Sequence, residues 1–311
     1  MKKVVVTGGA GFIGSHLAEL LANRDYHVIF LDDLSTGKMA NVEHFLEKAN
    51  IEFIQGSIID LPLLQQLFQD IDYVFHLAAI PSVLRSIENP VVSHNVNVTG
   101  TLNVLLAARD NKVRKVVYAS SSSVYGDTPQ LPKMEDMPTN PLSPYAVTKL
   151  AGEHYCWAFK QVYGLPTVYL RYFNVYGPRQ DLESLYATAI PMFIKRIANN
   201  SPPVIFGDGE QTRDFIYVKD VTEATILAAE SDVTGVFNIA TGSRISINHL
   251  AKFIINIMGG NSIKPVHNEP RIGEIRHSFA AISKAKSFGY YPRYSLEEGL
   301  KETILSFTGQ S

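Results

Sequence analysis

Near its N-terminus the chain reads VVVTGGAGFIG over residues 4–14. Three β-branched residues in a row predict a parallel strand that is buried on both faces. The glycines let the backbone turn sharply and approach a pyrophosphate, and the helix expected over 15–23 offers that anion its N-terminus. A second apolar strand, 27–31, ends at Asp32, where an acid can bind the adenosine ribose hydroxyls. This order predicts a dinucleotide-binding unit, and the acid favours NAD over NADP.

The alternation of strands and helices continues beyond this unit. Strands are expected over 51–54, 73–77, 116–118 and 167–170, and residues 91–111 carry apolar positions at helical spacing. Such alternation predicts an α/β fold, a Rossmann-type doubly wound parallel sheet with ligands at the carboxyl ends of its strands. After Gly177 the periodicity loosens, with helices expected over 190–197, 247–258 and 296–307 and a strand over 204–206.

The two patterns predict two domains that interleave in the sequence. Residues 1–174 plus about 214–240 are expected to form the NAD-binding Rossmann domain. A smaller, discontinuous α/β domain, about 175–213 plus 241–311, is expected to cap the strand ends and bind the substrate.

Composition narrows the classes of partner and compartment. The chain has 311 residues, of which 46% are hydrophobic, and its 28 basic and 30 acidic residues nearly balance at a net charge of −2. The absence of a basic run argues against nucleic acid. A single cysteine, Cys156, excludes an internal disulfide and a cysteine-rich metal site, so no metal is expected. With no signal-peptide pattern and no membrane-length apolar run, a cytoplasmic protein without membrane contact is expected.

A second informative stretch runs from Ser143 to Lys149 and reads SPYAVTK. Pro144 suits the first turn of a helix, and Tyr145 and Lys149, four residues apart, then share one helix face. A fixed ammonium favours the phenolate form of a neighbouring tyrosine. Moving a tyrosine pKa from about 10 to neutrality takes roughly 3 units, or about 4 kcal/mol, so a second cation is needed. The spacing alone is common on surface helices.

Further stretches make a family resemblance specific. The chain resembles the extended short-chain dehydrogenase/reductases over essentially all its length, and within them the UDP-hexose 4-epimerases. The closest local match is the bacterial type that works on UDP-N-acetylglucosamine. The stretches that carry the resemblance are 120–126 (SSSSVYG), 143–149, 170–177 (LRYFNVYG), 179–181 (RQD), 184–187 (SLYA), 190–191 (IP) and 212–215 (TRDF).

The resemblance implies roles for the residues that match the family motifs. Tyr145 would be the base, Lys149 would hold the nicotinamide ribose, and Ser121 would hydrogen-bond the reacting sugar oxygen. The family usually has aspartate where this chain has Ser57, which leaves out one adenine contact. NAD would be surrounded by Gly8, Gly11, Phe12, Ile13, Gly14, Asp32, Ile58, Leu77, Ala78, Ala79, Asn97, Tyr145, Lys149 and Tyr172.

A second implied set would bind a UDP-sugar. Ser122 and Ser123 line the turn that carries Ser121, and Ser278 stands where a bulky tyrosine restricts the pocket to glucose and galactose in relatives. The other members are a diphosphate clamp of Asn174, Arg213 and Arg271, a uracil face at Phe206, a ribose acceptor at Glu274, and contacts to a 2-acetamido group from Ser82 and Gln180.

The implied reaction inverts C4 of the sugar through a transient 4-keto intermediate, with NAD remaining bound. UDP-glucose/UDP-galactose and, given Ser278, UDP-GlcNAc/UDP-GalNAc are the expected pairs. Dehydratases carry an Asp-Glu pair where Ser122 and Ser123 stand, so dehydration is disfavoured. UDP-glucuronate epimerisation is a weaker alternative, because residues 180–184 (QDLES) replace the family's Arg-Pro-Asp-Met-Ala-like run. An NAD-binding sensor is the non-enzyme alternative, and a homodimer is expected by resemblance.

Several residues also have a purely structural interpretation. His76, inside an apolar strand, is expected to be a hydrogen-bonded core residue, and Phe206 is equally compatible with a core position. Tyr155, Trp157 and Phe159 are expected to serve packing, including packing against a partner subunit.

Overall fold

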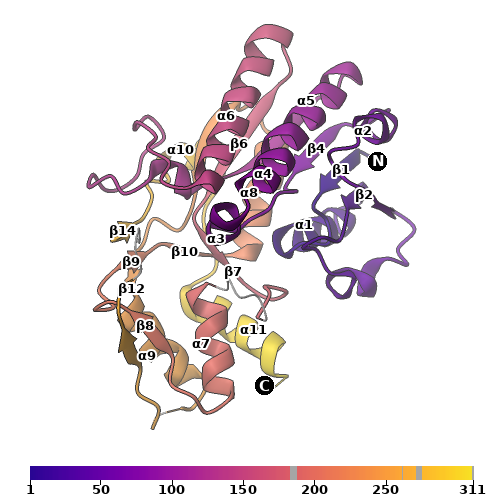
Figure 1. The fold of residues 1–311 in the computed structure, drawn as a ribbon. Helices are drawn as coiled ribbons and strands as arrows, with labels where there is room; N and C mark the ends of the chain where they lie inside the picture. The colour runs from indigo at the N-terminus through magenta and orange to yellow at the C-terminus, as the bar shows by residue number, and fades with distance from the viewer. Residues whose placement is uncertain (183–187, 261, 271–274, 310–311) are drawn as a thin grey trace.

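The centre of the molecule is a seven-stranded sheet in which every neighbouring pair is parallel (Figure 1). The computed structural model describes residues 1–182, 188–260, 262–270 and 275–309. The strand order is β11-β6-β5-β4-β1-β2-β3. The strands are β1 Lys3–Thr7, β2 His27–Asp32, β3 Ile51–Gln55, β4 Tyr73–His76, β5 Lys115–Ser121, β6 Thr167–Tyr172 and β11 Gly235–Ile239.

Helices cover both faces of this sheet, which explains why most positions of its central strands are apolar. Val4 and Val6 of β1 pack into one core layer with α1 (Phe12–Ala22) and α8 (Val218–Glu230). Val5 packs into the opposite layer with α2 (Leu61–Leu67), α5 (Gly100–Asp110) and α6 (Pro144–Tyr163). The predicted doubly wound Rossmann-type sheet is therefore confirmed, including the return of 236–239 as an edge strand.

The helix predicted over 91–111 is not regular. It comprises α4 (Pro90–His94), a π-helical turn (Asn95–Thr99) and α5. The Asn97 side chain at the centre of this turn hydrogen-bonds Ile80 and Thr148, so tertiary contacts accompany the wider turn. The short helices α2 and α3 (Val83–Glu88) were not predicted, because elements of six or seven residues carry too little periodicity.

The C-terminal part builds a separate core beside the sheet, lowest in Figure 1. Its centre contains Phe193, Ile194, Leu250, Ile254 and Leu300. The helices of this core are α7 Ala189–Ala198, α9 Ile247–Ile257 and α11 Leu296–Thr308, whereas α10 Ser283–Lys286 packs on β11 of the central sheet. Short strands pair as β7 (Asn174–Tyr176) with β10 (Phe215–Tyr217), β8 (Val204–Phe206) with β13 (Val266–Asn268), and β9 (Thr212–Arg213) between β12 (Ile245–Ser246) and β14 (His277–Ser278).

The described residues contain neither a candidate membrane-spanning helix nor a candidate metal-binding group. No helix there is both long enough and apolar enough to cross a membrane. Likewise, no three histidine, cysteine, aspartate or glutamate side chains in this part of the chain are grouped so that they could hold a metal ion.

Candidate active site

A cavity of about 360 Å³ lies at the carboxyl ends of the central strands. One wall comes from the ends of β1, β2, β4 and β5 and from the start of α6, and the other includes Arg179, Gln180 and Asp181. Every predicted NAD-contacting residue except Asn97 lines it, namely Gly8, Gly11, Phe12, Ile13, Gly14, Asp32, Ile58, Leu77, Ala78, Ala79, Tyr145, Lys149 and Tyr172.

The glycine turn has the geometry that a pyrophosphate requires. Gly8 has a positive φ of 73°, and a Cβ on it would lie 2.7 Å from the Ala78 nitrogen. A Cβ on Gly14 would collide with the Gly8 carbonyl oxygen. Gly11 precedes α1 and gives it no side-chain cap, so the helix N-terminus is open to an anion in the cavity. These residues therefore fit a dinucleotide.

Asp32 ends β2 with its carboxylate at the cavity wall. The Ala10 amide donates to Oδ2 and the Leu34 amide to Oδ1, both at 2.9 Å. Burial raises the pKa of Asp32, while these two amides act in the opposite direction. A carboxylate has about four acceptor positions, so two such bonds orient it and leave acceptors for ribose hydroxyls.

Asn97 lies behind the cavity wall instead of on it. The Ile80 amide donates to Asn97 Oδ1 at 2.8 Å, and Asn97 Nδ2 donates to Thr148 Oγ1 at 3.0 Å. The side chain is buried and joins the segment after β4 to α6. The structure thus places it where it orients the residues that line the cavity.

Helix α6 carries the predicted base, and its start is fixed by local sequence. Ser143 Oγ accepts from the Ala146 amide at 3.2 Å, and Pro144 occupies the first turn, as predicted. The Tyr145 amide donates to Ser86 Oγ of α3 at 2.9 Å, which ties the helix start to its neighbour. Tyr145 and Lys149 therefore reach the cavity from a rigid element.

The surroundings of Tyr145 within the protein favour its protonated form, which cannot act as a base. Burial raises the pKa of Tyr145 to about 12, opposed by a hydrogen bond with Ser121. Burial also lowers the pKa of Lys149 to about 8. The Lys149 Nζ donates to the Ala119 carbonyl at 2.9 Å and lies 6.0 Å from the Tyr145 ring centroid. Reaching neutrality from about 12 takes roughly 5 units, or about 7 kcal/mol, so a further positive charge is required.

The serine turn brings Ser121 to Tyr145 but gives Ser122 and Ser123 other surroundings. Ser121 Oγ accepts from the Ser123 amide at 3.2 Å at the start of a 3₁₀ turn over Ser122–Tyr125. The Ser123 hydroxyl is buried and has no hydrogen-bond partner among the described residues. None of Ser121, Ser122 and Ser123 is among the residues that line the cavity, which extends along the strand end to Ala119 and Ser120.

Two of the residues predicted to contact a 2-acetamido group do line the cavity. Ser82 caps α3 by accepting from the Arg85 amide at 3.2 Å. Gln180 Nε2 donates to Thr188 Oγ1 at 3.2 Å, while its Oε1 is buried and has no partner among the described residues. Gln180 therefore lies at the cavity wall with its Oε1 shielded from the cavity.

Four more of the predicted substrate residues lie on the short strands of the C-terminal part: Asn174, Phe206, Arg213 and Ser278. Asn174 begins β7, and Ser278 of β14 pairs in register with Arg213 of β9. Phe206 lines a separate depression together with His267, Glu269 and Pro270. Arg271 and Glu274 lie outside the described residues.

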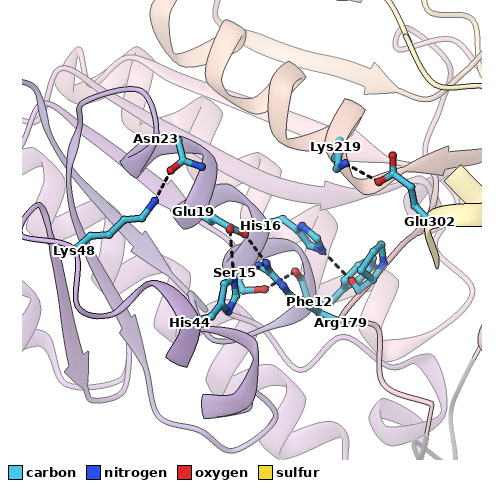
Figure 2. A network of polar contacts seen from close by, with 11 residues as sticks. Phe12, Ser15, His16, Glu19, Asn23, His44, Lys48, Arg179, Lys219 and Glu302 are labelled. Atoms are coloured by element: carbon cyan, nitrogen blue, oxygen red, sulfur yellow. Dashed lines mark hydrogen bonds and ion pairs between the residues drawn. The ribbon is translucent and has the colours of Figure 1, made fainter. Parts of the chain in front are cut away.

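Arg179 lines the cavity, although no role was predicted for it. It adopts a positive φ of 65°, and its Nη2 pairs with Glu19 of α1 and lies 2.9 Å from His44 Nε2 (Figure 2). Figure 2 also shows His16 pointing at the chain beside Arg179, where its Nε2 lies 2.9 Å from the Pro178 carbonyl. Lys38 Nζ donates to Asp181 at 2.7 Å, so residues 178–181 are joined to the N-terminal part by several side chains.

His76 has the core role predicted for it. It is buried, its Nδ1 lies 2.8 Å from Thr7 Oγ1, and its Nε2 lies 2.9 Å from Thr101 Oγ1. Burial lowers the pKa of His76 to about 3, so the ring is neutral at neutral pH.

The model of the NAD-dependent epimerase/dehydratase family matches residues 4–240, well over half of the chain. The chain belongs to the NAD-dependent epimerase/dehydratase family. The family and the NAD dependence predicted from the motifs are therefore confirmed.

Members of this family with several specificities are similar to the chain. A putative UDP-glucose 4-epimerase of Methanocaldococcus jannaschii is 41% identical, with 97% of both chains covered. The structure of a UDP-N-acetylglucosamine 4-epimerase from Methanobrevibacter ruminantium is 44% identical with a TM-score of 0.96, covering 100% of this chain and 99% of that one. A UDP-glucuronic acid 4-epimerase from Bacillus cereus, in complex with UDP-glucuronic acid and NAD, is 37% identical with a TM-score of 0.91, covering 99% of both chains.

Proposed function

We propose that the protein is a UDP-sugar 4-epimerase that accepts UDP-GlcNAc/UDP-GalNAc as well as UDP-glucose/UDP-galactose. The observation that carries this assignment is that Tyr145 and Lys149, one turn apart on α6, both line a cavity whose other residues fit a dinucleotide. Similarity to 4-epimerases of three sugar specificities supports the reaction type and leaves the sugar to be argued from the residues.

Different residues of the cavity would bind different parts of NAD. The residues of the glycine turn and the open N-terminus of α1 would hold the pyrophosphate, and Asp32 would accept from the adenosine ribose. Ile58 would pack against the adenine, and Lys149 would hold the nicotinamide ribose. Bound NAD⁺ supplies a hydride acceptor and a positive charge beside the phenol.

The chain's own groups move the proton. Ser121, at the end of β5, lies near enough to Tyr145 to lower the pKa of its phenol, so the proton of the sugar 4-hydroxyl would pass to the Tyr145 phenolate directly or through Ser121. Return of that proton to the 4-oxygen of the turned sugar completes the inversion. Ser122 and Ser123 offer no carboxylic acid for the loss of water, so the sugar keeps its hydroxyl groups.

The choice of sugar follows from polar groups and side-chain size. A serine at position 278 leaves space that a tyrosine would fill, and Ser82 and Gln180 at the cavity wall would contact the acetamido group. Asp181 lines the same cavity and pairs with Lys38. Residues 180–184 (QDLES) replace the Arg-Pro-Asp-Met-Ala-like run of the uronic-acid enzymes, so UDP-glucuronate is the weaker alternative.

The two predicted domains would bind different parts of the reacting complex. Residues 1–174 plus about 214–240 would bind NAD, and about 175–213 plus 241–311 would bind the UDP part through Asn174, Arg213, Phe206 and the predicted Arg271 and Glu274. A cytoplasmic homodimer fits the exposed apolar side chains that α3, α4 and α6 share, among them Leu84, Ile87, Val91, Val147 and Trp157.

Product analysis without added NAD tests the assignment. The purified chain is incubated separately with UDP-glucose, UDP-GlcNAc and UDP-glucuronate, and the sugars are resolved after release. We expect C4-inverted products from the first two. Product from UDP-glucuronate alone would reverse the choice of sugar, and reaction with none of the three would favour an NAD-binding sensor.

A further inference from the structure

Three consecutive residues at the end of β5 each lie beside a different side chain of α6. Lys149 Nζ donates to the Ala119 carbonyl at 2.9 Å, the Ser120 hydroxyl donates to Glu153, and Ser121 lies near enough to Tyr145 to lower the pKa of its phenol. The three α6 residues are spaced four apart, so they follow one another along one face of the helix. The face that carries the proposed base thus continues one turn further to a buried carboxylate.

That carboxylate is itself fixed. Arg171 of β6 donates to Glu153 through Nε at 2.9 Å and through Nη2 at 2.7 Å, and both side chains are about 5% exposed or less. The Tyr125 ring lies 4.6 Å from the Arg171 guanidinium, and its hydroxyl donates to Asn238 at 2.7 Å. Two-point contact with a planar guanidinium leaves the carboxylate one orientation.

Such a pair contributes little net stability, because removing two charges from water offsets most of their attraction. What it supplies here is geometry. The only side-chain hydroxyl that it binds, among the described residues, belongs to Ser120, which adjoins Ser121 in the chain. A shift of Ser120 would move Ser121 relative to Tyr145, and proton transfer depends on that separation.

We propose that Glu153 is a positioning residue, which, held by Arg171, fixes Ser120 and thereby sets the Ser121 hydroxyl against Tyr145. This role rests on the function proposed above for Tyr145 and Ser121. It assigns a part in the reaction to an ion pair that touches neither cofactor nor sugar.

The variant that tests this role is Ser120→Ala. Removing Glu153 itself would leave Arg171 buried without its counter-ion, which would strongly destabilise the fold. Ser120→Ala removes one hydrogen bond and keeps the Glu153–Arg171 pair. The matched control is Thr167→Val, because Thr167 Oγ1 donates to the Cys156 carbonyl at 2.8 Å, a buried strand-to-α6 bond remote from Ser121.

The expected results separate positioning from packing. Ser120→Ala should lower kcat about tenfold or more, with KM and the NAD bound per chain unchanged. The acidic limb of the kcat–pH profile should also move to higher pH, because a displaced Ser121 would no longer lower the pKa of Tyr145. Lys149 and Tyr118, which also lie near Tyr145, are unchanged in this variant. Thr167→Val should lower the melting temperature and leave kcat and the pH profile as in the wild type.

Three outcomes would overturn the role. These are wild-type kcat in Ser120→Ala, a fall in kcat matched by Thr167→Val, and loss of bound NAD, since Ser120 also lines the cavity. Tyr145→Phe, assayed alongside, distinguishes failure of the positioning role from failure of the proposed mechanism. If Tyr145→Phe is inactive while Ser120→Ala is unaffected, the positioning role alone fails, whereas an active Tyr145→Phe removes the proposed mechanism.

Discussion

Ser278 of β14 pairs in register with Arg213 of β9, so the residue proposed to set the size of the sugar pocket lies beside one proposed to bind the diphosphate. A side chain added at this position therefore narrows the site close to the substrate's anchor. We expect Ser278→Tyr to lower kcat/KM for UDP-GlcNAc by about tenfold or more, with a much smaller effect on UDP-glucose. Steady-state rates with both substrates measure this.

Ser278→Ala is the control for that substitution, because it removes the hydroxyl without adding bulk. It should retain both activities. Equal loss of the two activities in Ser278→Tyr would contradict a role in size selection and indicate a general disturbance of the strand.

Arg179 joins the cavity wall to α1 through its ion pair with Glu19. Both side chains are less than a third exposed, so we expect Arg179→Met to lower the free energy of unfolding by about 1–2 kcal/mol. Lys301→Met is the control, because the Lys301–Glu297 pair is more than half exposed and should contribute about 0.5 kcal/mol or less. Denaturant unfolding measures both, and equal effects would contradict a structural role for Arg179.

Two histidines, the buried His76 and the partly buried His16, predict how stability depends on pH. Burial, followed by the charge of Arg179, lowers the pKa of His16 to about 4, and burial lowers that of His76 to about 3. Both values lie below the unfolded value of about 6.5, so the unfolded chain binds more protons between them. Stability should be complete above about pH 6.5 and fall towards pH 4 by about 1.4 kcal/mol per pH unit for each histidine.

Replacing one of these histidines should flatten that dependence. His16→Asn should reduce the slope of unfolding free energy against pH below 6.5, and His94→Asn, at an exposed position, should leave it unchanged. Denaturant titrations at several pH values measure the slopes. Identical slopes for the two variants would show that His16 is not one of the groups responsible.

The proposed dimer can be tested on the exposed apolar residues of α4 and α6. Val91 is 66% exposed and Trp157 is 55% exposed. If a second copy covers them, Val91→Asp combined with Trp157→Asp should produce a monomer in sedimentation velocity, because each aspartate would be buried without a partner. A wild-type chain that sediments as a monomer would exclude the dimer.

Local sequence patterns were sufficient for the strands and the glycine turn of the fold. The order of strand, glycines and acid is a short-range signal, because each residue acts on its immediate neighbours or on a common ligand. The same holds for Pro144, Tyr145 and Lys149, which one helix places together. His76 was assigned to the core from its apolar neighbours alone.

Contacts between distant residues could not be predicted in the same way. The partners of Arg179 lie 160 and 135 positions away, and its positive φ has no signature in a non-glycine residue. Asn97 was expected beside the cofactor, but its π-helical turn directs its amide to Ile80 and Thr148. Glu153 and Arg171 are charged residues that a sequence pattern would place on the surface, and only the packing of α6 on β6 brings them together.

The central claim is that Tyr145 is the base of a UDP-sugar 4-epimerase, and Tyr145→Phe tests it most directly. The phenyl ring keeps the packing at the start of α6 and removes only the hydroxyl. We expect turnover in Tyr145→Phe to fall by about 10²–10⁴-fold. Turnover is measured as the interconversion of UDP-GlcNAc and UDP-GalNAc, and of UDP-glucose and UDP-galactose. NAD bound per chain should be unchanged. Turnover of either pair at the wild-type rate in Tyr145→Phe would contradict the account.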